Sequence, residues 1–323
     1  MCMSKQFLTA FTLFVILITP LASSESNDEF TVDNSEPDMT TGDYFLYELD
    51  MSGLLNSMQD EDIDEVRENS NTGMRMEYGG ESCLQTGWND CRIGLMSWEL
   101  NLTMIFSSGS GIDNDQAEML MKTESTSVFT ENKSEDTTIM RMDMWFSIDG
   151  EAYHQEIVTT EIAITTPIGE SEPEKVMIGD TWTTENIVET TVNEKTRMNA
   201  EAWEYEDEVI ESENITTNYN AESVSNVYIG NTSYQSLKIR SQDLGSEEMD
   251  YTYVANTGMP VKMESYENGS LQMIATLADY SWTNEPMPDS QENTIADDEL
   301  PGFTILSALM SALFAVYFVA RKE

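Results

Sequence analysis

Apolar and polar residues alternate along most of this chain, and this period of two constrains its fold more than any other feature. The clearest run is Thr138–Ile148, in which the apolar side chains fall on one side of an extended backbone. Those side chains are Met140, Met142, Met144, Phe146 and Ile148. Such alternation is typical of a β-strand with one buried and one wet face. Asp149-Gly150 follows at once and favours a tight hairpin turn.

Similar runs recur up to Trp282, separated by turn-forming residues. The predicted strands are Tyr44–Met51, Leu95–Phe106, Glu118–Thr130, Thr138–Ile148, Tyr153–Thr165, Thr196–Ile210, Ser223–Ile229, Ser233–Ser241, Met249–Val254, Met259–Tyr266 and Ser270–Trp282. We therefore expect an all-β ectodomain over residues 42–282. Its form would be a large antiparallel meander of about eleven or twelve strands, as a curved sheet or half-barrel. Ser52–Ser70 fits either one short helix or an acidic loop.

The N-terminus has the pattern of an export signal. Lys5 precedes the apolar run Phe7–Ile18, and the small residues Ala22–Ser24 offer a cleavage site. This pattern predicts a signal peptide over residues 1–24. Residues 25–41 are acidic and hydroxyl-rich without an apolar period, which predicts a disordered lead-in.

The C-terminus has the pattern of a membrane anchor. Residues 283–300 are rich in acids and proline and predict a stalk. Phe303–Ala320 is apolar and would give about 27 Å of helix, enough to cross a bilayer core. Arg321 and Lys322 then form a cytoplasmic cap, which places the acidic ectodomain outside the cell.

The order of Pro301, Gly302, Phe303, an apolar helix and a basic end resembles the PGF-CTERM sorting signal of archaeal surface proteins. The resemblance implies an archaeal cell-surface protein. It also implies an archaeosortase-like partner that removes the helix in favour of a lipid anchor. Thr304 stands where that family often has Gly, and the chain ends in Glu323. The alternative is a plain transmembrane anchor that is never cut.

The last third of the ectodomain resembles the closing strands of LolA/LolB-type lipoprotein-carrier domains. The resemblance lies in the strand rhythm between Asn231 and Tyr280 and in the segment Gly258-Met-Pro-Val-Lys262. It implies a curved antiparallel sheet around an apolar concave face. It carries no site residue over to this chain.

The Met-rich face of residues 138–148 allows three interpretations. Thioethers suit Cu(I), but the same spacing is what a buried sheet face requires. Met also favours adaptable apolar surfaces, so the face could hold a lipid or other apolar ligand. Met140, Met142, Met144 and Phe146 are therefore candidates for an apolar groove as well as for core packing.

Acidic residues dominate the charge. The chain has 60 Asp and Glu against 15 Lys and Arg, a formal net charge of −45. Such a charge repels phosphate backbones and excludes nucleic acid as a partner. The acid clusters Gln59–Glu65 and Asp113–Asp115 do not match a calcium-binding loop and are better interpreted as solvated loops, so we expect no bound metal.

Two cysteines remain after the signal peptide, and export to an oxidising compartment favours a disulfide between Cys83 and Cys91. The same compartment makes glycosylation of the Asn-x-Ser/Thr sites plausible. These sites are Asn101, Asn132, Asn214, Asn231 and Asn268.

No catalytic motif is found. The single histidine, His154, lies within a predicted strand and is expected to face solvent. We therefore expect no enzyme and no cofactor. The expected function is a membrane-anchored structural or interaction module at the cell surface. The alternative is a carrier of lipid or another apolar ligand in a curved-sheet groove.

Overall fold

The computed structural model describes residues 30–33, 38–57, 63–69, 72–83, 88–107, 111–112, 115–130, 133–169, 173, 175–206, 208–229 and 232–285. One short helix, α1, spans Ser52–Ser57. The strands are β1 Thr31–Asp33, β2 Tyr44–Asp50, β3 Ile63–Glu68, β4 Thr72–Gly80, β5 Arg92–Phe106, β6 Gln116–Thr130, β7 Lys133–Ile148, β8 Glu151–Pro167, β9 Lys175–Met177, β10 Thr181–Met198, β11 Glu204–Tyr205, β12 Val209–Ile229, β13 Thr232–Asp243, β14 Glu248–Ala255, β15 Pro260–Glu267 and β16 Ser270–Ser281.

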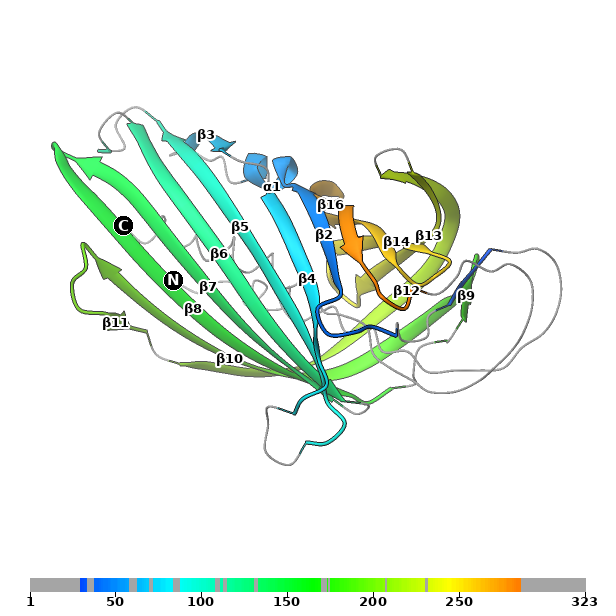
Figure 1. The fold of residues 1–323 in the computed structure, drawn as a ribbon. Helices are drawn as coiled ribbons and strands as arrows, with labels where there is room; N and C mark the ends of the chain where they lie inside the picture. Colours follow the sequence, from blue (N-terminus) through cyan, green and yellow to red (C-terminus); the bar gives the residue numbers. More distant parts are fainter. Residues whose placement is uncertain are drawn as a thin grey trace.

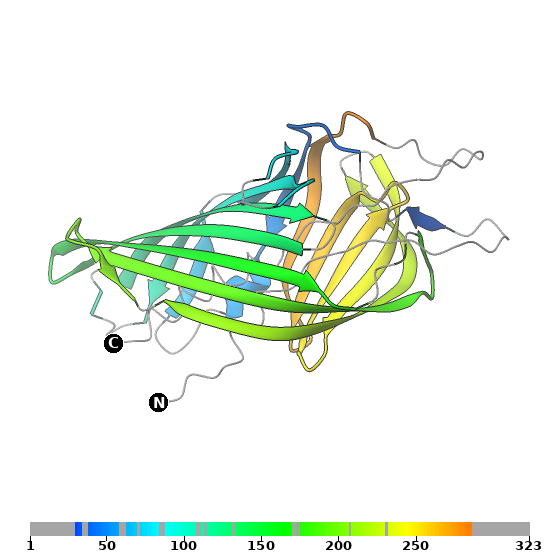
Figure 2. The ribbon, with the colours of Figure 1, turned by 90° about the horizontal axis from the view of Figure 1, so that it is seen from below.

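The main sheet closes on itself as a 12-strand antiparallel barrel. Its strands follow the order β10-β12-β13-β14-β15-β16-β2-β4-β5-β6-β7-β8, and β8 then pairs with β10. Figures 1 and 2 show the long strands β5–β8 side by side, with β10 continuing that wall toward β12–β14. The all-β antiparallel prediction is confirmed, but the open half-barrel is wrong because the β8–β10 pairing leaves no gap.

The hairpins form where the sequence supplies turn residues. Asp149 and Gly150 both have positive φ, at 53° and 82°, and join β7 to β8. Their side-chain chemistry suits this conformation, since Asp tolerates it and Gly has no Cβ to clash. The register then runs from Ile148↔Glu151 to Ser134↔Thr165 without a slip. Since every ring strand lies between residues 44 and 281, we expect this barrel to fold on its own.

A separate two-stranded sheet pairs β1 with β9. Val32 and Val176 of this sheet are fully buried and pack with Tyr219, Leu237 and other residues of β12–β14. The predicted disordered lead-in over residues 25–41 is therefore wrong at β1. A strand of three residues is too short for an alternation of apolar and polar residues to be recognised in the sequence. The ordered structure of β1 comes instead from this long-range packing.

The ambiguous segment after β2 contains both a helix and a strand. α1 begins after Asp50, whose Oδ1 accepts a hydrogen bond from the Ser52 backbone amide at 3.0 Å. Leu54 and Leu55 of α1 are buried, as an amphipathic helix requires. β3 then pairs with the second half of β5, beside the part that β4 occupies.

The main core lies inside the barrel and is rich in methionine. It joins inward side chains of β2, β4, β5, β6, β7, β15 and β16 with α1. No helix among the described residues is long and apolar enough to span a membrane. The predicted signal peptide, most of the stalk, and the sorting residues Pro301, Gly302, Phe303, Arg321 and Lys322 lie outside the described residues.

Candidate functional site

One part of the barrel interior is a packed apolar cluster, which we call the methionine core. Met140, Met142 and Met144 share its inner face, as the alternation predicts, and are 4%, 1% and 8% exposed. Across the hairpin, Met119 and Met121 lie directly opposite Met144 and Met142 and are fully buried. Phe146 is partly buried against the same cluster. These side chains fill a core and do not line an open surface.

The inner face of β12–β14 carries acids as well as the apolar residues that pack with Val32 and Val176. Three carboxyl groups, Asp243 on β13 with Glu248 and Asp250 on β14, face inward there and form what we call the acidic sector. The register places Asp250 opposite Ser241, and Asp243 opposite the buried Thr217. Glu213 on β12 and Glu267 on β15 add two more acids nearby. Sequence reasoning missed this sector because acids are frequent along the whole chain.

Burial perturbs these carboxyl groups in one direction. Loss of water raises the pKa of Asp243 to about 7, and the nearby Glu213 adds to the shift. The pKa values of Glu248 and Asp250 are also raised to about 7 by burial, with further contributions from neighbouring carboxylates. Thr217 opposes the shift at Asp243, because its hydroxyl donates to Asp243 Oδ1 at 2.8 Å. Even so, all three residues keep intermediate exposure, so water reaches this inner face.

Unpartnered polar atoms and an aromatic pair lie beside the acidic sector. Thr184 Oγ1 and Asn186 Oδ1 on β10 are buried and have no hydrogen-bond partner within the described part of the chain. Thr184 lies directly opposite Thr217, the partner of Asp243. Trp182 stacks on Tyr219 with ring centroids 4.9 Å apart and an angle of 3°. Buried polar atoms without partners are uncommon in proteins and call for a bound water, ion or ligand.

A second acidic pair joins β7 and β8. Burial raises the pKa of Glu161 to about 9, and Asp136 raises it further. The pKa of Asp136 is raised by burial to about 6, although serine hydroxyls oppose the shift. Glu161 therefore carries a proton at neutral pH. Asp136 Oδ1 has no partner among the described residues.

Cationic side chains lie almost entirely on the outside of the barrel. On the ring strands, alternation places every described Lys and Arg outward except Arg92, which lies near the disulfide. Several pack over outward aromatic rings, such as Lys238 over Tyr251 at 3.5 Å and Arg75 over Tyr44 at 3.9 Å. The acidic sector thus has no inward Lys or Arg beside it within the ring strands.

His154 faces outward on β8, as predicted. Its ring stacks on Trp145 at 5.0 Å, and its Nε2 lies 2.8 Å from Asp143 Oδ1. Asp143, His154 and Glu156 are close enough to share a metal ion. However, Glu156 already accepts two hydrogen bonds from Arg197, and this cation would repel a metal. The group is better interpreted as a surface ion-pair network.

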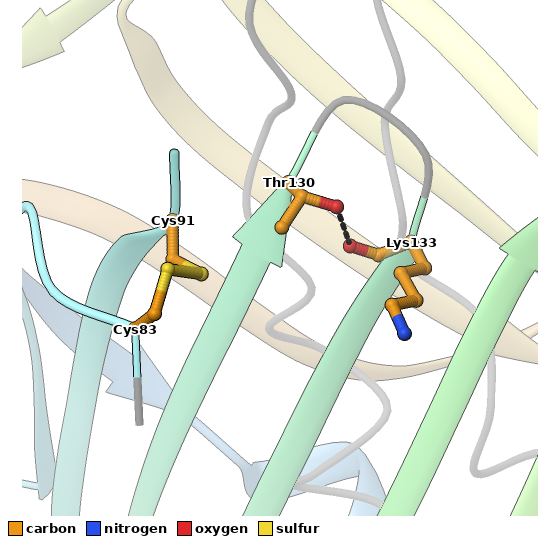
Figure 3. The surroundings of a disulfide bond; sticks show 4 residues. All are labelled: Cys83, Cys91, Thr130 and Lys133. Carbon is orange, nitrogen blue, oxygen red and sulfur yellow. Dashed lines mark hydrogen bonds between the residues drawn. A yellow bond between two sulfur atoms is a disulfide. The ribbon is translucent and has the colours of Figure 1, made fainter. Parts of the chain in front are cut away.

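The predicted disulfide is confirmed. Cys83 and Cys91 are bonded, with Cα atoms 4.9 Å apart (Figure 3). The bond lies near the β6–β7 connection, where Thr130 Oγ1 donates to the Lys133 carbonyl at 3.1 Å (Figure 3). The Lys133 ammonium lies 4.0 Å from the Trp88 ring centroid within the disulfide loop. The bridge therefore ties Cys83, which follows β4, to Cys91 at the start of β5.

The other candidate residues lie in varied places. Asn214 is exposed on β12, Asn268 is exposed in the β15–β16 turn, and Asn101 faces outward on β5. Asn132 and Asn231 lie outside the described residues, as do most of Gln59–Glu65 and Asp113–Asp115. Glu65 lies in β3 and is paired with Arg67 at 2.6 Å.

Comparison with known proteins gives little further guidance. No family model and no curated protein matches the chain. One solved structure is similar, a β-barrel-like protein of a domain of unknown function (DUF1849) from Brucella abortus. The two are 7% identical with a TM-score of 0.35, over 76% of this chain and 98% of the other.

Proposed function

We propose that this protein is an exported interaction module, held at the cell surface by its C-terminus, whose closed barrel serves as a binding scaffold. The observation that carries the proposal is the contrast between the two parts of the interior. The methionine core is filled, while the acidic sector keeps polar groups that water reaches. A filled core stabilises the scaffold, and unfilled polar capacity is what a binding site offers.

The apolar carrier is the second candidate function. Its support is the long inward row of Met and aromatic side chains, which adapt to apolar ligands. Against it, a lipid would have to displace packed side chains, since Met119, Met121 and Met142 are at most 1% exposed. The closed packing of the methionine core therefore favours the binding scaffold over the apolar carrier.

Uptake of a fluorescent fatty acid by the purified ectodomain, residues 25–300, separates the two functions. We expect no saturable uptake at concentrations below the fatty acid's micelle threshold. A matched pair of variants, Met142→Leu and Met142→Ala, tests whether the core can open. Two results together would establish the carrier instead. The wild type would take up the fatty acid saturably, and Met142→Leu would weaken this uptake without lowering the melting temperature.

Membrane attachment is tested separately in the native host. If the C-terminal segment is the anchor, deleting Thr304–Glu323 releases the protein into the medium. Retention of the shortened chain in the membrane fraction would contradict the anchor while leaving the barrel's role untouched.

A further inference from the structure

The acidic sector combines three features that rarely occur together inside a folded protein. Asp243, Glu248 and Asp250 share the inner face of β13 and β14, with no inward Lys or Arg on the neighbouring ring strands. Thr184 Oγ1 and Asn186 Oδ1 are oxygen acceptors on the same inner face, each in a residue 4% exposed, without a partner in the described chain. The stacked Trp182–Tyr219 pair borders them on β10 and β12.

These groups share one chemical need. Buried carboxyl groups gathered in one place are unfavourable unless a positive charge joins them or protons neutralise them. Oxygen acceptors without donors require N–H or O–H groups from elsewhere. An aromatic face attracts a cation, most of all one stripped of water. A positively charged nitrogen that carries N–H groups meets all three needs at once.

We propose that the acidic sector is a binding site for an organic ammonium ion, of the kind found in aliphatic diamines and polyamines. One ammonium group would lie beside Asp243 and Asp250, and a second N–H-bearing nitrogen of the same molecule would donate to Thr184 and Asn186 on β10. The methylene chain between them would lie beside Trp182. This proposal rests on the proposed function, because it names the ligand class of the same polar part of the barrel interior.

The donor geometry argues against a simple metal ion as the ligand. Among the described residues, the only group of three or more acidic, His or Cys side chains close enough to share one ion is Asp143, His154 and Glu156 on the outer face. The carboxyl groups of the acidic sector are therefore spaced too widely for a single Ca²⁺, which needs six to eight oxygens at roughly 2.3–2.6 Å. An extended cation with separated N–H groups spans such spacing.

Proton release distinguishes this site from the acidic outer surface. Because burial raises the pKa of Asp243, Glu248 and Asp250 to about 7, these groups are partly protonated at neutral pH when no ligand is bound. Their neighbours on the packed strands are Thr217 and Glu213 on β12, Ser241 on β13, and Ser265 and Glu267 on β15, none of them cationic. A bound ammonium lowers the pKa of these carboxyls, and roughly one proton leaves per ligand at pH 7. Exposed carboxylates are already ionised and release none.

The test is isothermal titration of the ectodomain with putrescine and spermidine at pH 7 in 0.3 M NaCl. Salt at this level screens attraction by the outer surface. Paired runs in phosphate and MOPS buffers, whose ionisation enthalpies differ and which carry no primary ammonium group, count the protons released. We expect saturable binding with a stoichiometry of one and release of roughly one proton.

Two double variants that each remove two carboxyl groups provide the matched comparison. Asp243→Asn with Asp250→Asn should weaken putrescine binding at least about tenfold and abolish proton release, because it removes both charges that hold the ammonium. Glu118→Gln with Glu124→Gln, on the exposed outer face of β6, should change neither. The inner variant is expected to fold, since it removes carboxyl groups that burial destabilises, and its thermal melt confirms this.

Three outcomes would overturn the proposal. An equal loss in both double variants would show attraction by surface charge alone. Binding without proton release would place the amine elsewhere on the chain. Tighter saturable binding of Ca²⁺ or Mg²⁺ than of putrescine, lost in the inner variant, would make the sector an inorganic cation site.

Discussion

Glu161 provides the sharpest test of the acidic interior. It faces inward on β8, is 7% exposed, and burial beside Asp136 raises its pKa to about 9 from an ordinary value of 4.5. A carboxyl group with a raised native pKa stabilises the fold fully below its unfolded-state pKa and loses this contribution as pH rises through the native pKa. The ordinary behaviour of salt-bridged acids is the reverse.

The size of the effect follows from the proton that Glu161 must carry. At pH 7 the unfolded chain would release this proton and the native chain keeps it, at a cost of about 1.4 kcal/mol for each pH unit above 4.5. This gives a ceiling of about 3.5 kcal/mol at pH 7. Glu161→Gln has nearly the same shape and no proton to hold, so it should raise the melting temperature at pH 7 by up to roughly 7–14 °C.

Thermal melts of the ectodomain at pH 4.5, 7 and 8.5 measure this change. The gain from Glu161→Gln should be near zero at pH 4.5 and grow toward pH 8.5. Glu118→Gln on the exposed outer face is the control and should shift the melting temperature little at any pH. A loss of stability at pH 7 would show that native Glu161 is ionised and paired. A gain that stays constant across the three pH values would show that Glu161 holds no extra proton in the native state.

Three further predictions follow from other parts of the chain. Replacing both Cys83 and Cys91 by Ser should lower the unfolding free energy by about 2.5 kcal/mol, as measured by urea denaturation, because the bridge closes a short loop of the unfolded chain; an unchanged midpoint would contradict this. Met142→Asp should unfold the barrel, since it places a charge in a side-chain position that is 1% exposed. Arg141→Asp on the outward neighbour should leave circular dichroism native, and a folded Met142→Asp would refute the filled core. Lowering the pH from 8.5 to 5.5 should raise the wild-type melting temperature, because burial raises the pKa of Asp136, Asp243 and Asp250 as well.

Alternation predicted the strands whose inner face is apolar. The predicted strand Thr138–Ile148 lies within β7, and Leu95–Phe106 lies within β5. In both, Met and Leu recur at every second position, so the buried face is visible from the sequence. The disulfide was also predictable, since a chain with a predicted signal peptide has few other uses for two remaining cysteines.

The same reasoning failed where the inner face is polar. β10 turns Thr184, Asn186 and Thr190 inward, and no apolar alternation marks most of its 18 residues. The sequence instead predicted one strand over Thr196–Ile210, a stretch that contains the end of β10, a turn and the start of β12. Because β10 is the strand that closes the ring, missing it left the sheet open as a half-barrel.

The polar inner face and the closed ring therefore have a common origin. A barrel of this size is too wide for the side chains of its strands to fill the whole interior. Here one arc of the wall is packed with Met and Leu. The remaining arc of β8, β10, β12, β13 and β14 has two smaller apolar clusters, and between them it carries hydroxyl, amide and carboxyl groups inward. Lys and Arg turn outward, several of them over aromatic rings. If the inward residues of this arc served only to pack the interior, threonine and serine would cost less free energy there than acids, whose pKa values rise on burial. Acidic residues at these inward positions are better explained by a positively charged ligand than by the needs of the fold. The number of protons released when an amine binds is therefore the measurement that bears most directly on function.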